Sequence, residues 1–238
     1  VLDFEIPSDL AAQRDEIRAF VAQQIVPFER DPRLTRHGPN EDLRNELVDL
    51  ARKAGLLTFQ APRRFGGREP SHREQAVLYE AAGWSTLGPV ALNCAAPDEG
   101  NMFILGKIAT EAQAEEFLVP VIDGHQRSVF AMTEPGGAGS DPDQLTTEAI
   151  FDGEQYVING RKWLITGANG ARTWIIMARV APNPHGGDGP TLFLCDGRTP
   201  GIELERVMDT MDRNYVEGHG VVRFDNLTLP ASAVLGEV

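Results

Sequence analysis

Cysteine is scarce in this 238-residue chain, which contains only Cys94 and Cys195. The two residues lie far apart, and neither belongs to the closely spaced Cys and His pattern that zinc sites need. This excludes a zinc site. It also predicts two free thiols in a reducing compartment, because disulfides persist mainly where the surroundings are oxidising.

Long hydrophobic runs are also missing. No apolar stretch approaches the roughly 20 residues of a membrane-spanning helix, so we expect no membrane insertion. Residues 1–7 lack the basic start and apolar stretch of a signal peptide, which predicts a cytoplasmic protein, or an organelle-matrix protein in a eukaryote. Position 1 is Val and not Met, so we expect the true N-terminus to be missing.

Basic residues are in deficit, because 22 Lys and Arg stand against 35 Asp and Glu and give a formal net charge of -13. Nucleic-acid binding needs a basic face, so that class of function is excluded. An anionic ligand would need local basic groups, for which the candidates are Arg161, Lys162, Arg172 and Arg213. The alternative is that these four are ordinary solvated surface charges.

Apolar residues before residue 128 recur at the spacing of helices, first over 10–25 and again over 43–54. The second stretch has Asn40 before its start. Ser71 and Thr110 each precede a Glu or Gln by three residues, which is the capping-box pattern. We predict an all-α helical domain over residues 1–127, with these apolar stripes forming its core.

From residue 128 the pattern changes to strands and turns. Asp152-Gly153 and Asn159-Gly160 are dipeptides typical of two-residue hairpins. The composition of 182–190 indicates a loop, and further strands are predicted at 172–180, 191–195, 201–207 and 220–229. We predict an α+β protein in which the helical domain is followed by an antiparallel β-barrel or sandwich domain over residues 128–238.

Residues 130–141, Phe-Ala-Met-Thr-Glu-Pro-Gly-Gly-Ala-Gly-Ser-Asp, run from a strand into a glycine-rich turn. Glycines allow a backbone to approach a flat ligand, and successive N–H groups form a concavity for acceptor groups. Thr133 and Ser140 add hydroxyls. The segment is neither a P-loop nor a Rossmann fingerprint, because the required spacings are absent. By itself it fits either a cofactor site or a plain structural turn.

Residues 156–168, Tyr-Val-Ile-Asn-Gly-Arg-Lys-Trp-Leu-Ile-Thr-Gly-Ala, are predicted to form a hairpin that turns at Asn159-Gly160. Trp163, followed by the hydroxyl of Thr166 at the strand end, suits a wall against a planar ring with a hydrogen bond to that ring. The alternative is that Trp163 is part of the core and that Thr166 is a solvated strand end.

Together the two segments resemble the signature of the acyl-CoA dehydrogenase family, and the resemblance extends over nearly the whole chain. The stretch 61–67 is similar to the Pro-x-x-x-Gly-Gly loop of that family's helical domain, and 222–230 is similar to its later β segments. Residues 93–98 and 217–220 most resemble the branch that is elsewhere fused to an aminoglycoside-phosphotransferase-like domain.

This resemblance implies FAD-dependent α,β-dehydrogenation of an acyl-CoA thioester, in which a carboxylate removes the Cα proton and hydride passes from Cβ to flavin N5. It also implies an electron acceptor such as an electron-transfer flavoprotein, and a homo-oligomer. Ser140 and the backbone of Glu134 would meet the substrate. The residues that it implies for FAD binding, with the Thr166 hydroxyl near N5, are Phe130, Ala131, Met132, Thr133, Gly139, Ser140, Trp163, Leu164, Ile165 and Thr166.

Three features depart from the family pattern. The loop 136–139 has one residue more than usual. Leu164 stands where Trp is usual, which implies a thinner flavin wall and leaves acyl-CoA oxidase and flavin monooxygenase as alternatives to dehydrogenase. The general base is usually a Glu on a C-terminal four-helix domain that this chain lacks. We therefore assign no catalytic residue, and expect a fragment, a partial subunit completed by a partner chain that supplies that domain, or a non-catalytic assembly subunit.

Overall fold

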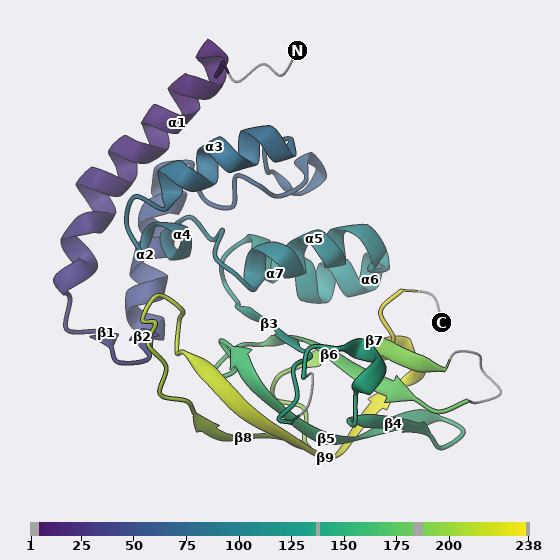
Figure 1. The fold of residues 1–238 in the computed structure, drawn as a ribbon. Helices are drawn as coiled ribbons and strands as arrows, with labels where there is room; N and C mark the ends of the chain where they lie inside the picture. The colour runs from purple at the N-terminus through teal and green to yellow at the C-terminus, as the bar shows by residue number, and fades with distance from the viewer. Residues whose placement is uncertain (1–4, 137–138, 183–187, 237–238) are drawn as a thin grey trace.

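The computed structural model describes residues 5–136, 139–182 and 188–236. Figure 1 shows the helices above a sheet. The helical elements are α1 Ser8–Phe20, η1 Val21–Ile25, η2 Val26–Arg30, α2 Glu41–Lys53, η3 Arg63–Phe65, α3 His72–Ala82, α4 Gly88–Ala91, α5 Asp98–Ile108, α6 Glu111–Gln113, η4 Ala114–Leu118, α7 Val119–Ile122, η5 Pro142–Gln144 and η6 Ala231–Ala233. The strands are β1 Leu34–Thr35, β2 Gly38–Pro39, β3 Ser128–Ala131, β4 Glu148–Phe151, β5 Gln155–Thr166, β6 Thr173–Val180, β7 Gly189–Asp196, β8 Ile202–Val207 and β9 His219–Pro230.

The predicted helix starts are confirmed. Asn40 accepts a hydrogen bond from a main-chain N–H in the first turn of α2. Ser71 forms a complete capping box with Glu74 at the start of α3, and Thr110 forms one with Gln113 at the start of α6. These caps give partners to N–H groups that the first turn of a helix leaves unpaired.

Apolar side chains form three buried clusters. One lies within the helical part and a second lies within the sheet. The third joins the two parts, because residues of α5, η4 and α7 pack on residues of β6 and β7. Its most buried members are Leu105, Leu118, Val121, Ile175 and Leu194. The helices are therefore docked on the sheet by a continuous apolar contact.

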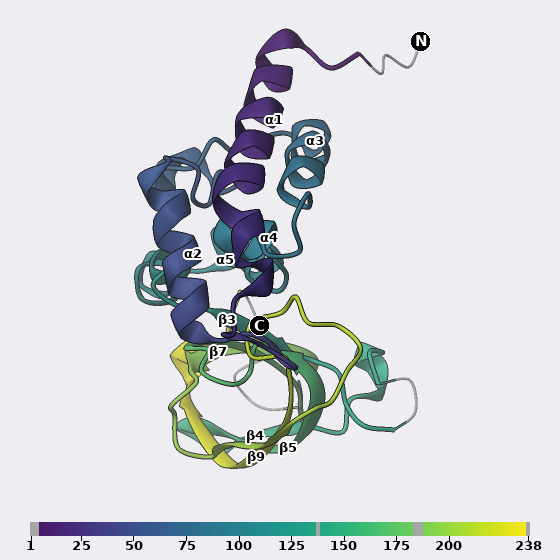
Figure 2. The same ribbon diagram turned by 90° about the vertical axis from the view of Figure 1, so that its left-hand side faces the viewer.

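The strand order is β3-β6-β4-β5-β9-β8, and β7 also pairs with β6. Seen along the second view, this sheet curls on itself (Figure 2). The predicted class is confirmed: helices are followed by a curled sheet. The hairpin at Asp152-Gly153 is also present, between β4 and β5. Most pairs are antiparallel, but β6 pairs in parallel with both β3 and β4.

The hairpin predicted at Asn159-Gly160 is wrong. Gln155–Thr166 is one strand that pairs with β9, and the ladder shifts register at this dipeptide. A Cβ on Gly160 would lie 2.3 Å from Thr147 Oγ1, so the close approach of β4 requires glycine here. The Asn159 side chain accepts a hydrogen bond from the Asn226 N–H at 2.8 Å. The dipeptide therefore lies within a continuous strand, opposite a bulge of β9 at Asp225 and Asn226, and not in a turn.

Gly160 and Gly100 provide a matched pair of glycine substitutions, because an added Cβ meets a close neighbour only at Gly160. Gly160→Ala is expected to lower the free energy of unfolding by about 1–3 kcal/mol, because the added methyl group overpacks against Thr147. Gly100→Ala is expected to raise it by about 0.5–1 kcal/mol, because Gly100 lies in α5 with no atom close to the added Cβ. Urea unfolding of both variants measures the two changes, and changes of the same sign would contradict the close approach of Thr147 to Gly160.

Within the described ranges, no helix is long and apolar enough to cross a membrane. The same residues contain no group of three or more His, Cys, Asp or Glu that could hold a metal ion. Both cysteines are buried and free, as predicted.

Candidate functional site

The two segments singled out in the sequence lie side by side. Met132 and Thr133 continue β3 beyond its last residue, and their carbonyl groups are bonded by β5. Lys162 Nζ donates to the Met132 oxygen at 2.8 Å, and the Trp163 N–H donates to the Thr133 oxygen at 3.0 Å. These two bonds fix the strand end against the second half of β5, although the bonded residues lie 30 positions apart in the sequence.

Lys162 is buried, with none of its side chain exposed. Both interpretations offered for it from the sequence, a surface charge and a group for an anionic ligand, are therefore wrong. Its inward direction follows from strand alternation, because Tyr156 and Ile158 on the same strand are also buried. Of the other three candidates, Arg161 pairs with Glu205 and Arg172 with Asp196, while Arg213 is exposed.

Glu134 is the partner of Lys162, at 2.8 Å. Its two carboxylate oxygens also accept hydrogen bonds from Thr146 N and Oγ1 at 2.7 and 2.6 Å and from Thr147 N at 2.9 Å. Burial acts to raise the pKa of Glu134, but the hydrogen bonds from Lys162, Thr146 and Thr147 outweigh it and lower the pKa to about 2. A carboxylate occupied in this way is structural, and is not free to act as a base.

This pKa predicts a pH dependence. The pKa of Glu134 is about 2 in the folded chain against an ordinary value of 4.5, so the unfolded chain binds the proton more readily. The stabilisation is therefore complete above pH 4.5 and is lost as the pH falls toward 2. The stability advantage of the natural chain over a Glu134→Gln/Lys162→Met double variant is expected to shrink between about pH 5 and about pH 3. Urea unfolding at several pH values measures it, and a constant difference would contradict the assignment.

The glycine-rich turn closes tightly after Glu134. The Glu134 N–H donates to the Gly139 oxygen at 2.9 Å, and a Cβ on Gly139 would lie 2.2 Å from the Glu134 oxygen. Glycine is therefore needed at 139 for steric reasons. Ser140 follows on the exposed side of the turn. Positions 137 and 138, which include the additional loop residue, lie outside the described residues.

A second bulge interrupts β5 at Trp163 and Leu164, where the pairing with β9 shifts register. Leu164 adopts a φ of +55° and leaves 44% of its surface exposed. A positive φ is uncommon for a residue with a side chain, and it is found where the surrounding structure enforces it. Trp163 is half-buried. The bulge thus presents an apolar surface at the point where β5 meets the end of β3.

Thr166 ends β5 and lies opposite His219 in the ladder with β9. The Thr166 Oγ1 is 2.9 Å from His219 Nδ1, and His219 Nε2 is 2.9 Å from Asp212 Oδ2. Sequence reasoning used residues 217–220 only for the family branch and missed this chain of contacts. The strand pairing that joins it was not visible in the local pattern.

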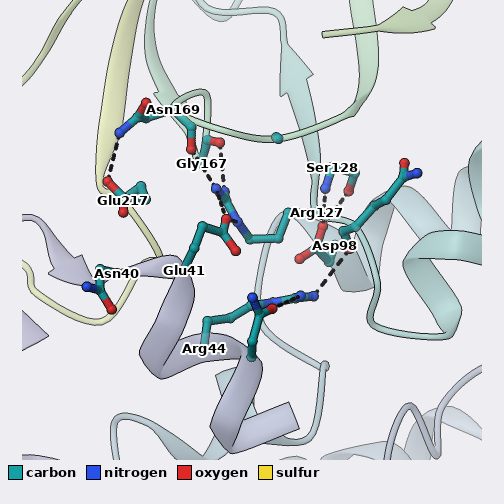
Figure 3. A network of polar contacts seen from close by, with 12 residues as sticks. Asn40, Glu41, Arg44, Asp98, Arg127, Ser128, Gly167, Asn169 and Glu217 are labelled. Atoms are coloured by element: carbon teal, nitrogen blue, oxygen red, sulfur yellow. Dashed lines mark hydrogen bonds and ion pairs between the residues drawn. The ribbon is translucent and has the colours of Figure 1, made fainter. Parts of the chain in front are cut away.

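Arg127 holds the turn that follows Thr166 (Figure 3). Its guanidinium donates to the Gly167 oxygen at 2.8 Å and the Asn169 oxygen at 2.5 Å, and it pairs with Glu41 at the start of α2. The side chain is only 4% exposed. One buried cation therefore ties the end of β5 to the helical part.

The first residue of β3 is held by α5 in the same network (Figure 3). Asp98 accepts from the Ser128 N–H and from its hydroxyl, both at 2.6 Å, and Asn101 donates to that hydroxyl at 2.9 Å. Burial raises the pKa of Asp98, against the lowering effect of the Ser128 hydrogen bonds. Both strands of the candidate site are thus anchored at the helix–sheet boundary.

The residues expected at the site separate into two kinds. The side chains of Ala131 and Ile165 are in the core of the sheet, so only their main chains remain for a ligand, whereas Phe130 is half-buried and packs toward the helices. The hydroxyls of Thr133 and Ser140 make no hydrogen bond to any residue that the structure describes. The Thr133 main chain is bonded to Trp163, next to the exposed Leu164, which fits a ring with apolar faces and a polar edge. Contact with a flavin stays a prediction for each residue.

Comparison with known proteins agrees with this arrangement. Residues 7–125 match the family description "Acyl-CoA dehydrogenase, N-terminal domain", and residues 129–227 match "Acyl-CoA dehydrogenase, middle domain". The "Probable acyl-CoA dehydrogenase FadE2" of Mycobacterium tuberculosis is 34% identical over 99% of the chain. "Acyl-CoA dehydrogenase family member 10" of Mus musculus is 32% identical over 93% of it. The chain spans 60% of the first relative and 22% of the second.

Solved structures give the same result. A Mycobacterium abscessus protein described as an acyl-CoA dehydrogenase is 35% identical, with a TM-score of 0.86 over 98% of this chain and 61% of that one. Butyryl-CoA dehydrogenase from Megasphaera elsdenii is 25% identical, with a TM-score of 0.76 over 99% of this chain and 60% of that one. The predicted resemblance is confirmed, including the family member 10 and 11 branch, and the chain belongs to the acyl-CoA dehydrogenase family.

Proposed function

We propose that this chain forms part of an FAD-dependent enzyme that introduces an α,β double bond into an acyl-CoA thioester. The supporting observation is that the segment just beyond β3 is bonded to the bulge of β5, which places Thr133 next to the strand that carries Leu164 and Thr166. Family membership supports the same reaction class. The division of the chain into a helical domain over 1–127 and a β domain over 128–238 belongs to this proposal.

Bound FAD would supply the hydride acceptor, which no side chain offers. The chain's own residues would hold and orient it. The main chain around Met132 and the hydroxyl of Thr133 would bond the polar edge of the ring, and Trp163 with Leu164 would cover an apolar face. Thr166 would place its hydroxyl against a ring nitrogen. Gly139 and Ser140 would admit the phosphate or pantetheine groups, with the Glu134 main chain next to them.

The general base is proposed to lie outside these 238 residues. Glu134 directly follows Met132 and Thr133, which are proposed to contact the ring, but both of its carboxylate oxygens already accept hydrogen bonds. Dehydrogenation would therefore need the C-terminal helical domain of the family, from a longer chain or from a partner chain. An electron-transfer flavoprotein is the proposed acceptor, and a homo-oligomer is the proposed assembly.

Retention of FAD tests the proposal directly. The visible absorption spectrum is recorded after incubation with FAD and desalting, for this chain and for a chain extended by the C-terminal domain. Flavin bands in either are the expected result. Absence of flavin from both would overturn the proposal, because the site would then hold no cofactor.

Thr166→Val is expected to weaken the binding of reduced FAD about fivefold, since one hydrogen bond is worth about 1 kcal/mol and the polar edge would lose its partner. Thr228→Val is the matched control, because Thr228 is an exposed threonine on β9 away from the bulge. Both affinities are measured by titrating reduced FAD into the two variants and recording the quenching of protein fluorescence. The variants are made in whichever chain, the 238-residue one or the extended one, holds flavin. Equal affinities in the two variants would remove Thr166 from the site.

An acyl-CoA oxidase is the second candidate, favoured by the exposed Leu164 at the position where the family usually has the larger Trp. A thinner wall admits oxygen to the ring more readily. Peroxide release with acyl-CoA and no other acceptor would support the oxidase. Turnover that requires an electron-transfer flavoprotein would support the dehydrogenase.

A further inference from the structure

The hydroxyl of Thr166 has a partner that the family resemblance does not assign. His219 lies beside it on β9, with its Nδ1 at 2.9 Å from Thr166 Oγ1. A threonine hydroxyl has a single hydrogen and two acceptor positions. The direction of this one bond therefore decides whether the hydroxyl offers a hydrogen or a lone pair to a ligand.

Asp212 determines which nitrogen of His219 carries a hydrogen. The Thr210 hydroxyl donates to Asp212 Oδ1 at 2.5 Å, and His219 Nε2 lies 2.9 Å from Asp212 Oδ2. The Thr210 hydroxyl lowers the pKa of Asp212, and His219 adds to the effect. An ionised carboxylate only accepts hydrogen bonds, so His219 Nε2 must be the donor.

The His219 ring is held in place on all sides that the structure describes. It is 8% exposed, and the Tyr215 ring packs against it edge to face at 5.1 Å. The titratable groups facing it are Asp212 and Tyr215, while β5 contributes only the uncharged Thr166. An uncharged ring with its hydrogen on Nε2 has a bare Nδ1, and that nitrogen would accept the Thr166 hydrogen.

We propose that Asp212 and His219 are positioning residues that turn the Thr166 hydroxyl into a hydrogen-bond acceptor toward the flavin site. This inference rests on the proposed function. A flavin N5 accepts a hydrogen bond in the oxidised ring and carries a hydrogen in the reduced ring. A hydroxyl that offers its lone pair therefore favours the reduced cofactor, and the pair sets the redox poise of the site.

The position of the hydrogen is measurable without cofactor. ¹⁵N-labelled 238-residue chain is observed by long-range ¹H–¹⁵N NMR at neutral pH, and the His219 nitrogens are assigned with a His219→Gln variant. Hydrogen on Nε2 and a bare Nδ1 are the expected result. Hydrogen on Nδ1, in either the neutral or the charged ring, would overturn the proposal.

Asp212→Asn is expected to reverse this geometry, because the amide oxygen would take the Thr210 hydrogen in place of Oδ1, and the amide nitrogen would then donate to Nε2 and move the ring hydrogen to Nδ1. Asp212→Glu keeps an acceptor and is expected to retain the natural tautomer. Asp209→Asn is the matched control on the same segment, since Asp209 is 73% exposed and does not contact His219. A ring tautomer that is identical in Asp212→Asn and Asp209→Asn would contradict the role of Asp212.

The flavin-loaded chain provides the second readout. The midpoint potential is expected to become more negative in Asp212→Asn and to remain unchanged in Asp209→Asn, since only the first turns the Thr166 hydrogen toward the ring. An unchanged potential in Asp212→Asn would overturn the effect on the cofactor. Failure of every chain to hold FAD would instead defeat the proposed function, and the NMR result would still decide the position of the hydrogen.

Discussion

Replacing Lys162 with Met is expected to lower the free energy of unfolding by about 3–5 kcal/mol, because it leaves the buried Glu134 carboxylate without its cation. Met has nearly the length of Lys and fills the same space, so a cavity does not account for the loss. The substitution also removes the bond from Nζ to the Met132 oxygen. Urea unfolding followed by far-UV circular dichroism measures the change.

The neighbouring residue gives the control. Arg161 is one position away on β5, but its side chain is 51% exposed and pairs with Glu205 on the surface. Arg161→Gln is expected to change stability by only about 0–1 kcal/mol. Adding Glu134→Gln to Lys162→Met is expected to recover part of the loss, because the uncompensated charge is removed. Equal losses in Lys162→Met and Arg161→Gln would show that the ion pair is not structural.

The second large effect is expected at Arg127. Arg127→Met removes the donors to the Gly167 and Asn169 carbonyls and the partner of Glu41, which we expect to destabilise the chain by about 3 kcal/mol. Arg127→Lys is expected to recover little, because a single ammonium group does not reproduce the planar fork of the guanidinium. The turn after Thr166 would lose its anchor, so FAD retention is expected to fall together with stability.

Arg223→Met is the matched control for this variant. Arg223 lies on β9 of the same sheet, is 49% exposed and pairs with Glu203 at the surface. Its replacement is expected to change stability by about 0–1 kcal/mol and to leave FAD binding unchanged. Chemical unfolding and flavin titration are measured on both variants. An Arg127→Met chain that unfolds like Arg223→Met would contradict the anchoring role.

Local signals in the sequence were sufficient for the helical part and most strands. A cap is formed within four or five consecutive residues. The local sequence around Asn40, Ser71 and Thr110 was therefore sufficient to predict where the helices begin. The dipeptide at Asn159-Gly160 was misleading because a glycine in a tight turn and a glycine required by a close neighbour have the same local composition. Only the approach of Thr147, the residue before β4, distinguishes them.

The candidate site was predicted in its two segments but not in its polar interior. From the sequence, Lys162 is interpreted as a group for an anionic ligand or as a surface charge, because charged residues are almost never fully buried without a partner. Its partner Glu134 lies just beyond β3, and the burial alternation of β5 was the available signal. The contact of Thr166 with His219 and Asp212 depends on the register between β5 and β9, which no local pattern encodes.

The parallel pairing of β3 with β6 also fixes an order in time. β3 emerges first during synthesis, yet its partner begins only at Thr173, and β5 waits still longer for β9. Contacts between strands so distant in the sequence require a large loop to close, and the entropy cost of closure comes before the contacts stabilise the chain. Such sheets therefore form slowly compared with helices. The helical part is therefore complete while apolar strands of the later half are still unpaired. For this chain, the newly made polypeptide passes through an interval in which the strands of its proposed cofactor site form an open, aggregation-prone edge.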